Sequence, residues 1–194
     1  MKKYSKALAM CAALCSAPAF AAEVDGCPAG SYSVVLAPDG STLSVLFDKF
    51  NVESGAGGTG SSRKVCRISA PLKLPPNQSI GVYKVDYRGF AKLGARQEGQ
   101  LDVQYFLGPH GKQNGRVFKR KIKGAHEGDY IFTETLGAGQ MKRVGCGSEA
   151  VLNAQITLQL SGDAAAEPAM AALDTADGAA KGGMVYHLNL KDCK

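Results

Sequence analysis

Tryptophan is absent from the sequence, and histidine occurs only three times. No apolar run approaches the roughly 20 residues that a membrane-spanning helix needs. The chain also lacks the GxSxG turn of serine hydrolases, the HExxH helix of zinc proteases and the pattern of a calcium-binding loop. These absences argue against a membrane-spanning protein and against several common classes of hydrolase.

The N-terminus has the pattern of an export signal. Three lysines within residues 2–6 precede the apolar stretch 7–14, and residues 19–21 supply the small-x-small pattern of a cleavage site. We therefore expect residues 1–21 to be a signal peptide and residues 22–194 to form one secreted domain, extracellular or periplasmic. Removal of the signal takes three of the 23 Lys and Arg residues and leaves 20 against 17 Asp and Glu, so the net charge falls from +6 to +3. So mild a charge gives no reason to expect specific nucleic-acid binding.

Four cysteines remain after the expected cleavage, and an even number in an exported chain indicates disulfides. No CxxC or Cys–His spacing indicates a metal site, so we predict two disulfides and no cofactor. Cys27 and Cys66 open the first and third expected strands, which run the same way in a meander. Cys146 opens and Cys193 closes the last two strong strands, and the two cysteines would meet if these strands pair as a hairpin. The favoured pairing is therefore Cys27–Cys66 with Cys146–Cys193, and the alternative is Cys27–Cys193 with Cys66–Cys146.

Apolar and polar residues alternate with a period of two along most of the chain. In residues 152–160 the odd positions are Asn, Gln or Thr and the even positions are Leu, Ile or Ala, the pattern of a strand with one buried face. No comparable helical period is present. The sequence predicts an all-β fold, an antiparallel β-sandwich of jelly-roll or Greek-key type with long loops. The other expected strands are 32–36, 43–47, 66–74, 101–105, 116–123, 130–134 and 184–190.

Two segments of biased composition interrupt this pattern. Residues 163–180 are rich in alanine, and Pro168 stands where a first helical turn accepts proline, so we expect a long loop with one short helical turn. Residues 55–60 read GAGGTG, which matches the glycine spacing of a dinucleotide-binding turn. That turn must open a helix, whereas a strand pattern follows here, so we interpret the segment as a hairpin loop.

The segment 116–123 contains five basic residues. Lysines on a strand most often protect a sheet edge from pairing with another chain. The sharper hypothesis is a docking site for a polyanion, such as an envelope polysaccharide or another anionic surface. Phe118 is the one aromatic residue of the segment, fewer than a nucleic-acid surface needs. The candidate polyanion-binding residues are Arg116, Lys119, Arg120, Lys121 and Lys123.

A histidine next to two carboxylates is the alternative candidate site. His126, Glu127 and Asp129 have the chemistry to bind a metal ion or to transfer protons. Residues this close together in a turn rarely converge on one point, and no nucleophile is visibly paired with them.

A second row of charges alternates with apolar residues in residues 83–88. We interpret Lys84, Asp86 and Arg88 as the solvent-exposed face of a strand, where such a row is largely self-neutralising. The intervening residues are expected to face the core: Tyr83, Val85 and Tyr87.

Seven sequence blocks follow one another along the chain: GCPAGS (26–31), LFDKF (46–50), CRISAPLKLPPNQSIGV (66–82), DYRGFAKL (86–93), GDY (128–130), CGSEAVLNAQITLQL (146–160) and HLNLKDC (187–193). Together they resemble a known family of small secreted proteins from bacteria and filamentous fungi, the domain of unknown function 4360. The resemblance covers nearly all of the chain beyond the signal, including its four cysteines. Family members carry a tryptophan shortly before the third cysteine, where this chain has Val144. The family has no agreed activity, so the resemblance implies secretion and no catalytic residues.

Three classes of function remain open at this point. The leading hypothesis is a secreted, non-catalytic module that binds an envelope or extracellular component, either a polysaccharide or another polyanion. The second is a hydrolase or metal-dependent enzyme centred on His126. The third is a structural protein that associates with itself.

Overall fold

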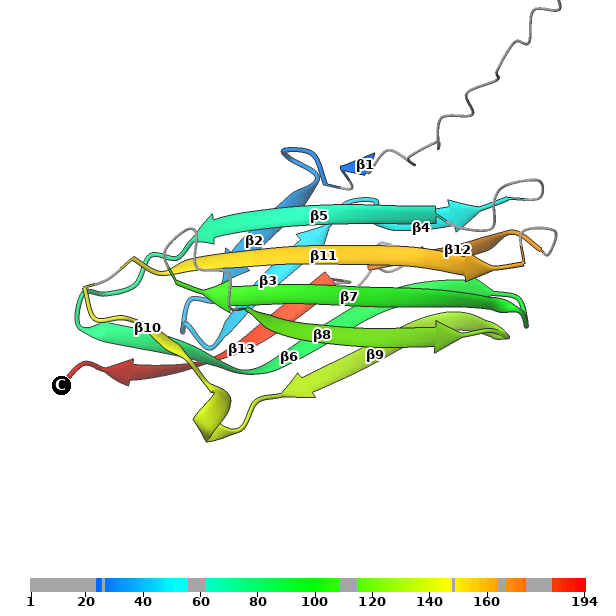
Figure 1. The fold of residues 1–194 in the computed structure, drawn as a ribbon. Helices are drawn as coiled ribbons and strands as arrows, with labels where there is room; N and C mark the ends of the chain where they lie inside the picture. The colour runs from blue at the N-terminus through cyan, green and yellow to red at the C-terminus, as the bar shows by residue number, and fades with distance from the viewer. Residues whose placement is uncertain are drawn as a thin grey trace, which may run out of the picture.

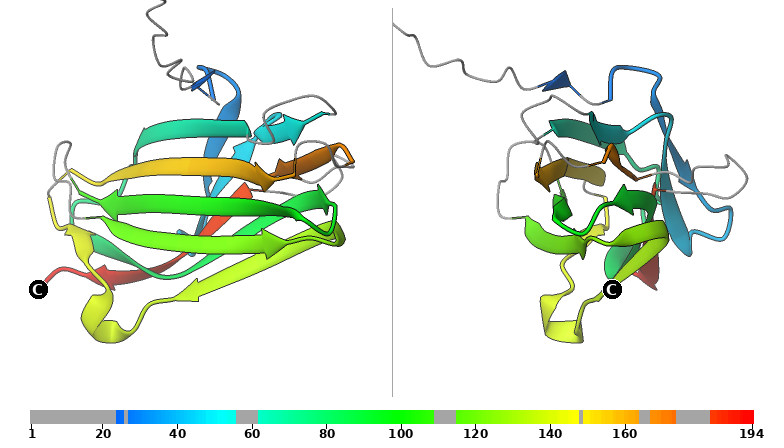
Figure 2. Two further views of the ribbon diagram at one scale, coloured as in Figure 1. Left: turned by 45° about the vertical axis from the view of Figure 1, so that its right-hand side comes forward. Right: turned by 90° about the vertical axis from the view of Figure 1, so that its right-hand side faces the viewer.

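The computed structural model describes residues 24–25, 27–55, 62–108, 115–147, 149–163, 167–173 and 183–194. The expected signal peptide, nearly all of the GAGGTG segment and much of the alanine-rich segment lie outside the described residues. The described chain consists of β-strands and one short 3-10 helix, η1 (Ala138–Gln140). The strands form two sheets that pack face to face, as Figures 1 and 2 show. This arrangement confirms the predicted all-β sandwich.

The first sheet has five strands and a nearly regular antiparallel register. Its central strand, β11, pairs along its length with β5 on one side and with β7 on the other. The short strand β1 extends the sheet at one edge by pairing parallel to β5, and β8 forms the other edge. In spatial order the strands are β1 (Val24–Asp25), β5 (Ser62–Pro71), β11 (Val151–Gly162), β7 (Gln97–Leu107) and β8 (Arg116–Lys123).

The second sheet is built around the sixteen-residue strand β6 (Gln78–Leu93). One side of β6 pairs first with β13 and then with β12, and the other side pairs with β10 and then with β9. The hairpin of β2 and β3 continues the sheet beyond β13, and β4 continues it beyond β12. The remaining bounds are β2 (Tyr32–Leu36), β3 (Thr42–Phe47), β4 (Asn51–Ser54), β9 (His126–Thr135), β10 (Arg143–Gly145), β12 (Ala169–Ala172) and β13 (Gly183–Asp192).

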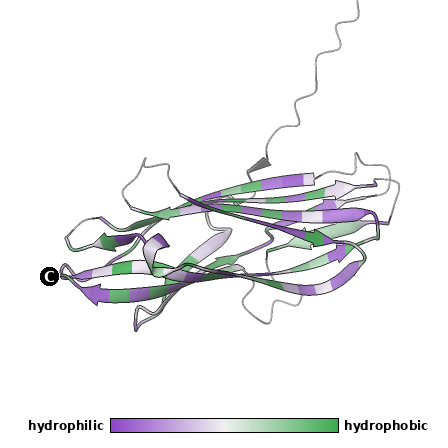
Figure 3. Cartoon of the chain, turned by 60° about the horizontal axis from the view of Figure 1, so that its bottom comes forward, coloured by the Kyte–Doolittle hydropathy of each residue, from purple (hydrophilic) through white to green (hydrophobic). Residues whose placement is uncertain are grey.

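The core lies between the two sheets and follows from the alternation seen in the sequence. Figure 3 shows apolar and polar residues alternating along the strands. In β7 and β11, Leu101, Val103, Ile156 and Leu158 are fully buried. Burial of each such side chain stabilises the folded state by about 1.5–3 kcal/mol relative to exposure. The same alternation sends the polar residues of these strands to the outer face of the sheet, where the candidate site lies.

The two predicted disulfides are present, Cys27–Cys66 and Cys146–Cys193. The prediction for the first pair assumed two strands that run in the same direction. Such a pair exists, but the strand that runs parallel to β5 is β1, which ends just before Cys27. The hairpin argument for the second pair is wrong, because β11 and β13 belong to different sheets. Cys146 and Cys193 meet because β10 and β13 flank the beginning of β6 on its two sides. In the chain-entropy model each disulfide contributes about 3–4 kcal/mol.

Two expectations about local structure are wrong. In the alanine-rich segment, Ala169–Ala172 form strand β12 between β6 and β4, where the sequence predicted a helical turn. In β6, Tyr83 is 40% exposed and does not face the core. The register of β6 against β13 shifts between His187 and Leu188, so Tyr83 lies in a β-bulge that interrupts the alternation.

Candidate functional site

The basic segment predicted as a docking site forms strand β8, and its residues divide between the two faces of the strand. Phe118 and Ile122 are buried in the core. Lys119, Lys121 and Lys123 alternate with them and are exposed on the outer face of the five-stranded sheet. The five candidate cations therefore do not form one continuous surface.

Arg116 belongs to a polar network that joins the two sheets. Its Nε and Nη2 atoms donate to Glu134 Oε1 on β9, at 3.0 and 2.8 Å. Glu134 Oε2 accepts hydrogen bonds from the hydroxyls of Tyr87 and Tyr105, at 3.1 and 3.2 Å. Burial would lower the pKa of Arg116, but the hydrogen bonds and charge of Glu134 raise it above its ordinary value. Burial raises the pKa of both tyrosines, so they stay neutral donors. The guanidinium of Arg116 is thus engaged with Glu134, although its side chain is still 35% exposed.

Three of the remaining four cations of β8 also have neighbours that reduce their field. Lys119 Nζ lies 3.6 Å from Asp102 Oδ2, and Lys121 Nζ lies 2.8 Å from Glu98 Oε1, both on the adjacent strand β7. The guanidinium carbon of Arg120 lies 4.5 Å from the centre of the Phe118 ring. Exposed ion pairs contribute about 0–1 kcal/mol to stability, and an external anion can replace their partners.

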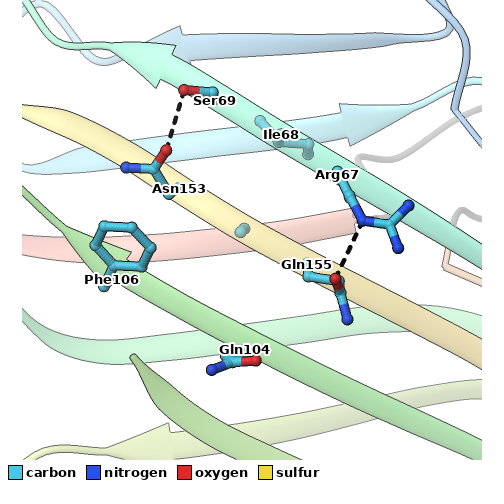
Figure 4. Close-up of a pocket in the computed structure, with 8 residues that line it drawn as sticks. Arg67, Ile68, Ser69, Gln104, Phe106, Asn153 and Gln155 are labelled. Atoms are coloured by element: carbon cyan, nitrogen blue, oxygen red, sulfur yellow. Dashed lines mark hydrogen bonds between the residues drawn. The ribbon is translucent and has the colours of Figure 1, made fainter. Parts of the chain in front are cut away.

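A shallow depression of about 450 Å³ lies on the same outer face, over β5, β11 and β7 (Figure 4). Three of the side chains around it are amides, one is a guanidinium, one a hydroxyl and one an aromatic ring. Strand alternation places these side chains on the outer face of the sheet, since each is the neighbour in sequence of a residue that points into the core. The side chains are Arg67, Ser69, Gln104, Phe106, Asn153 and Gln155.

The register of the three strands arranges these side chains in two parallel rows across the sheet. Neighbouring strands lie about 4.8 Å apart, so each row spans about 10 Å. The amides of β11 occupy the middle of both rows, and β7 supplies the ring of one row and the third amide of the other. The two rows are Ser69–Asn153–Phe106 and Arg67–Gln155–Gln104.

Hydrogen bonds along the rows orient the polar groups. Ser69 Oγ donates to Asn153 Oδ1 at 3.1 Å, and Arg67 Nε donates to Gln155 Oε1 at 3.2 Å. Asn153 Nδ2 also lies 3.4 Å from the carbonyl oxygen of Gly108. Side chains that are ordered before binding lose less entropy when a ligand arrives. The depression therefore presents oriented donors and acceptors next to an apolar ring.

The charged row of β6 is the solvent face that the sequence suggested only in part, since Arg88 is exposed and Lys84 half-buried but Asp86 is not exposed. Asp86 is only 6% exposed. Its Oδ1 accepts a hydrogen bond from Thr133 at 2.7 Å, while its Oδ2 lies 2.8 Å from His187 Nε2 and 3.1 Å from Lys84 Nζ. Burial would raise the pKa of Asp86, but the hydrogen bonds of Thr133, His187 and Lys84 together lower it below its ordinary value. His187, on β13, was not recognised as a partner because the contact joins residues 101 positions apart.

The alternative acid–base or metal residues lie at the beginning of β9. His126 is half-buried with its Nε2 3.1 Å from the carbonyl oxygen of Gly128, while Glu127 and Asp129 are exposed. Glu127 pairs with Lys92 on β6 at 3.0 Å. Within the described part of the chain, no group of three His, Cys, Asp or Glu residues could hold a metal ion. The structure does not bring these three side chains to one point.

The sequence contained the residues of the depression but not their adjacency. Asn153 and Gln155 were visible as polar positions of a predicted strand, and Gln104 and Phe106 lie at or just beyond the end of another. Their meeting depends on which strands are neighbours and in which register, and strand alternation gives neither. The stretch of three amides next to one ring is therefore a property of the fold.

The fold, the disulfides and this polar outer face define a small disulfide-linked β-sandwich domain. The chain belongs to the family described as Domain of unknown function (DUF4360), whose model matches residues 21–193. Among the described residues, no helix is long and apolar enough to cross a membrane.

Two similar proteins add to this assignment. An uncharacterized secreted protein of the fungus Arthroderma benhamiae is 29% identical over 138 residues, which are 70% of this chain and 55% of the relative, so the chain spans about half of that protein's length. This relative and the two disulfides confirm the prediction that the protein is secreted. The cryo-EM structure of the extra small virus particle of the prawn Macrobrachium rosenbergii is 13% identical and covers 70% of this chain and 83% of its own. Its TM-score of 0.24 is too low to support a shared fold.

Proposed function

We propose that this protein is a non-catalytic binding module that holds a polysaccharide on the outer face of its five-stranded sheet. The observation that carries the proposal is the two-row depression, in which oriented amides flank an aromatic ring. Sugars present hydroxyls that both donate and accept hydrogen bonds, as amides do. They also present apolar C–H faces, which pack on an aromatic ring such as Phe106.

The shape of the surface supports an extended ligand. The depression is open and lies on a sheet, and the outward row of β11 continues beyond it to the half-buried Gln159. A chain polymer can occupy such a surface over several units, whereas a small molecule needs a deeper enclosure to bury most of its area.

The lysines of β8 border this surface and extend the proposal to acidic polysaccharides. Lys119 stands beside Asp102 in the register of β8 and β7, and Asp102 in turn stands beside Thr157 on β11. An anionic polymer lying across the sheet would therefore reach these cations. Their contribution is electrostatic, so it is expected to fade over the screening length of about 8–10 Å at physiological salt.

The experiment is affinity electrophoresis in native gels that contain dextran, a neutral polysaccharide, or alginate, an acidic one. The double variant Gln104→Ala/Gln155→Ala is expected to bind roughly tenfold more weakly, because each lost hydrogen bond contributes about 0.5–1.5 kcal/mol. Phe106→Ala is expected to weaken binding by a similar factor. Gln140→Ala, which changes an exposed amide of η1, is the matched control and should bind normally.

Two results of this experiment would contradict the proposal. If neither gel retards any of these proteins, the polysaccharide hypothesis is wrong for these two polymers. Retardation that is equal in the wild type and in the Gln104→Ala/Gln155→Ala variant would move the site away from the depression. Thermal unfolding of each variant would show that the domain remains folded.

A further inference from the structure

A second depression of about 470 Å³ opens at one corner of the sandwich, where the β2–β3 hairpin and the end of β5 diverge. Its walls come from both sheets, so it is a gap at the margin of the core. Most of its lining is aliphatic. The lining residues are Val34, Leu36, Leu43, Ser69, Ala70, Pro71, Leu72 and Lys73.

The corner is open because the two sheets end at different places. β5 ends at Pro71, and the segment that follows leaves the sheet after Leu72 donates its N–H to the carbonyl oxygen of Ala150 at 2.7 Å. The inner face of β2 extends past this point, so Val34 and Leu36 are only half-buried although they face the core. An apolar group that entered the gap would complete their burial.

A cation stands at the mouth of this apolar gap. Lys73 is exposed and forms no ion pair within the described part of the chain. Aliphatic walls with one cation at the entrance match an alkyl chain that carries an anionic group at its head.

The corner gap and the polysaccharide surface meet at one residue. Ser69 lines both depressions, with its hydroxyl in the row of Asn153 and its main chain next to Ala70 in the gap. A ligand that rounds the edge of β5 at Ser69 would touch both surfaces without crossing another strand.

We propose that the ligand of this protein is an acylated acidic glycan, whose sugars lie on the amide rows and whose alkyl chain enters the corner gap. Lys73 binds the anionic group close to the junction of sugar and chain. This inference rests on the proposed function and adds to it the chemical class of the ligand.

The test is calorimetric titration with octyl β-D-glucuronide, methyl β-D-glucuronide and octyl β-D-glucoside, each below its micellar concentration. The octyl glucuronide is expected to bind at least tenfold more tightly than the methyl glucuronide, since burial of two methylene groups alone contributes a factor of about 15. Lys73→Ser is expected to weaken binding of the octyl glucuronide and to leave the octyl glucoside unchanged. Lys142→Ser, at an exposed lysine on another element, is the control and should change neither.

Two further variants separate loss of the gap from loss of the fold. Leu72→Asn makes the wall polar, and Val34→Phe fills the gap while keeping it apolar. Both are expected to abolish the difference between the octyl and methyl glucuronides. The polysaccharide retention of Val34→Phe should equal that of the wild type, which would show that the outer face is intact.

The outcomes keep the two proposals apart. Equal affinity for the octyl and methyl glucuronides, with polysaccharide retention still sensitive to Gln104→Ala/Gln155→Ala, would overturn the acyl chain and leave the polysaccharide surface standing. Octyl binding that Val34→Phe blocks but Gln104→Ala/Gln155→Ala does not weaken would overturn the link between gap and glycan. Octyl binding that neither Leu72→Asn nor Val34→Phe reduces would place the alkyl chain elsewhere and overturn the inference.

Discussion

The two faces of β8 hold their charges in opposite ways. On one face Arg116 donates two hydrogen bonds to Glu134, whose side chain is only 10% exposed and also accepts from two tyrosines. On the other face Lys119 and Asp102 form a longer contact, and the lysine side chain is 65% exposed. In the first pair the carboxylate is largely withdrawn from water and depends on its hydrogen bonds, whereas the second pair keeps its hydration. The same basic segment therefore supplies a structural element on one face and solvent-exposed cations on the other.

The largest effect is expected when the buried carboxylate of Glu134 is removed. Glu134→Ala is expected to lower the free energy of unfolding by roughly 2–4 kcal/mol, because Arg116 and two tyrosine hydroxyls lose their partner. The value should lie below that of a fully buried pair, since Arg116 retains access to solvent. Urea unfolding followed by circular dichroism measures the difference. Glu98→Ala, which removes the partner of Lys121, is the matched control and should cost less than about 1 kcal/mol.

A second buried carboxylate, away from β8, tests whether burial alone decides how much stability is lost when a carboxylate is removed. Asp86 lies within the eight-stranded sheet and is held there by Thr133, Lys84 and His187. Its pKa is lowered in the folded state, so its ionised form stabilises the fold above the ordinary aspartate pKa, and this contribution is lost as the pH falls through the lower pKa of the folded protein.

Asp86→Asn should therefore reduce the free energy of unfolding by about 1–2 kcal/mol at neutral pH, the contribution of hydrogen bonds to a charged group. In acid, the difference in this free energy between the variant and the wild type should become smaller. Unfolding measured from neutral to acidic pH gives both values. A gap that stays constant over the whole range would show that the charge of Asp86 does not contribute. Asp48→Asn, at an exposed position after β3, is the control.

These contrasts also show what strand alternation can and cannot predict. The sequence of residues 152–160 alternates without interruption, and all its apolar positions are buried as predicted, while of its polar positions only Thr157 is buried. The all-β sandwich was accessible for the same reason, because it depends on local pattern. The cysteine number predicted two disulfides, but Cys146 meets Cys193 because of the strand order around β6, which the local pattern does not contain. The burial of Asp86 was not accessible, since it results from a histidine and a threonine on two neighbouring strands. Tyr83 was misplaced because a bulge has no signature in the alternation itself.

The smallest effect on stability is expected for three exposed cations of β8, where the measurement of interest is binding. Lys119 and Lys121 lie on its outer face, and Arg120 lies on the side of Phe118. The triple variant Lys119→Ser/Arg120→Ser/Lys121→Ser removes two exposed ion pairs and one contact with the Phe118 ring. Its free energy of unfolding should change by no more than about 1–2 kcal/mol, because each of these exposed interactions contributes about 0–1 kcal/mol.

The same variant should elute earlier than the wild type from heparin at low salt, and the two should converge as salt rises and screens the remaining field. Arg116 is left unchanged, since its bond to Glu134 makes it part of the fold. Arg120→Ser alone is the informative comparison, because Arg120 differs from the two lysines in lying over the Phe118 ring. Equal elution of wild type and triple variant at low salt would show that these cations protect the edge of the sheet and do not bind polyanions.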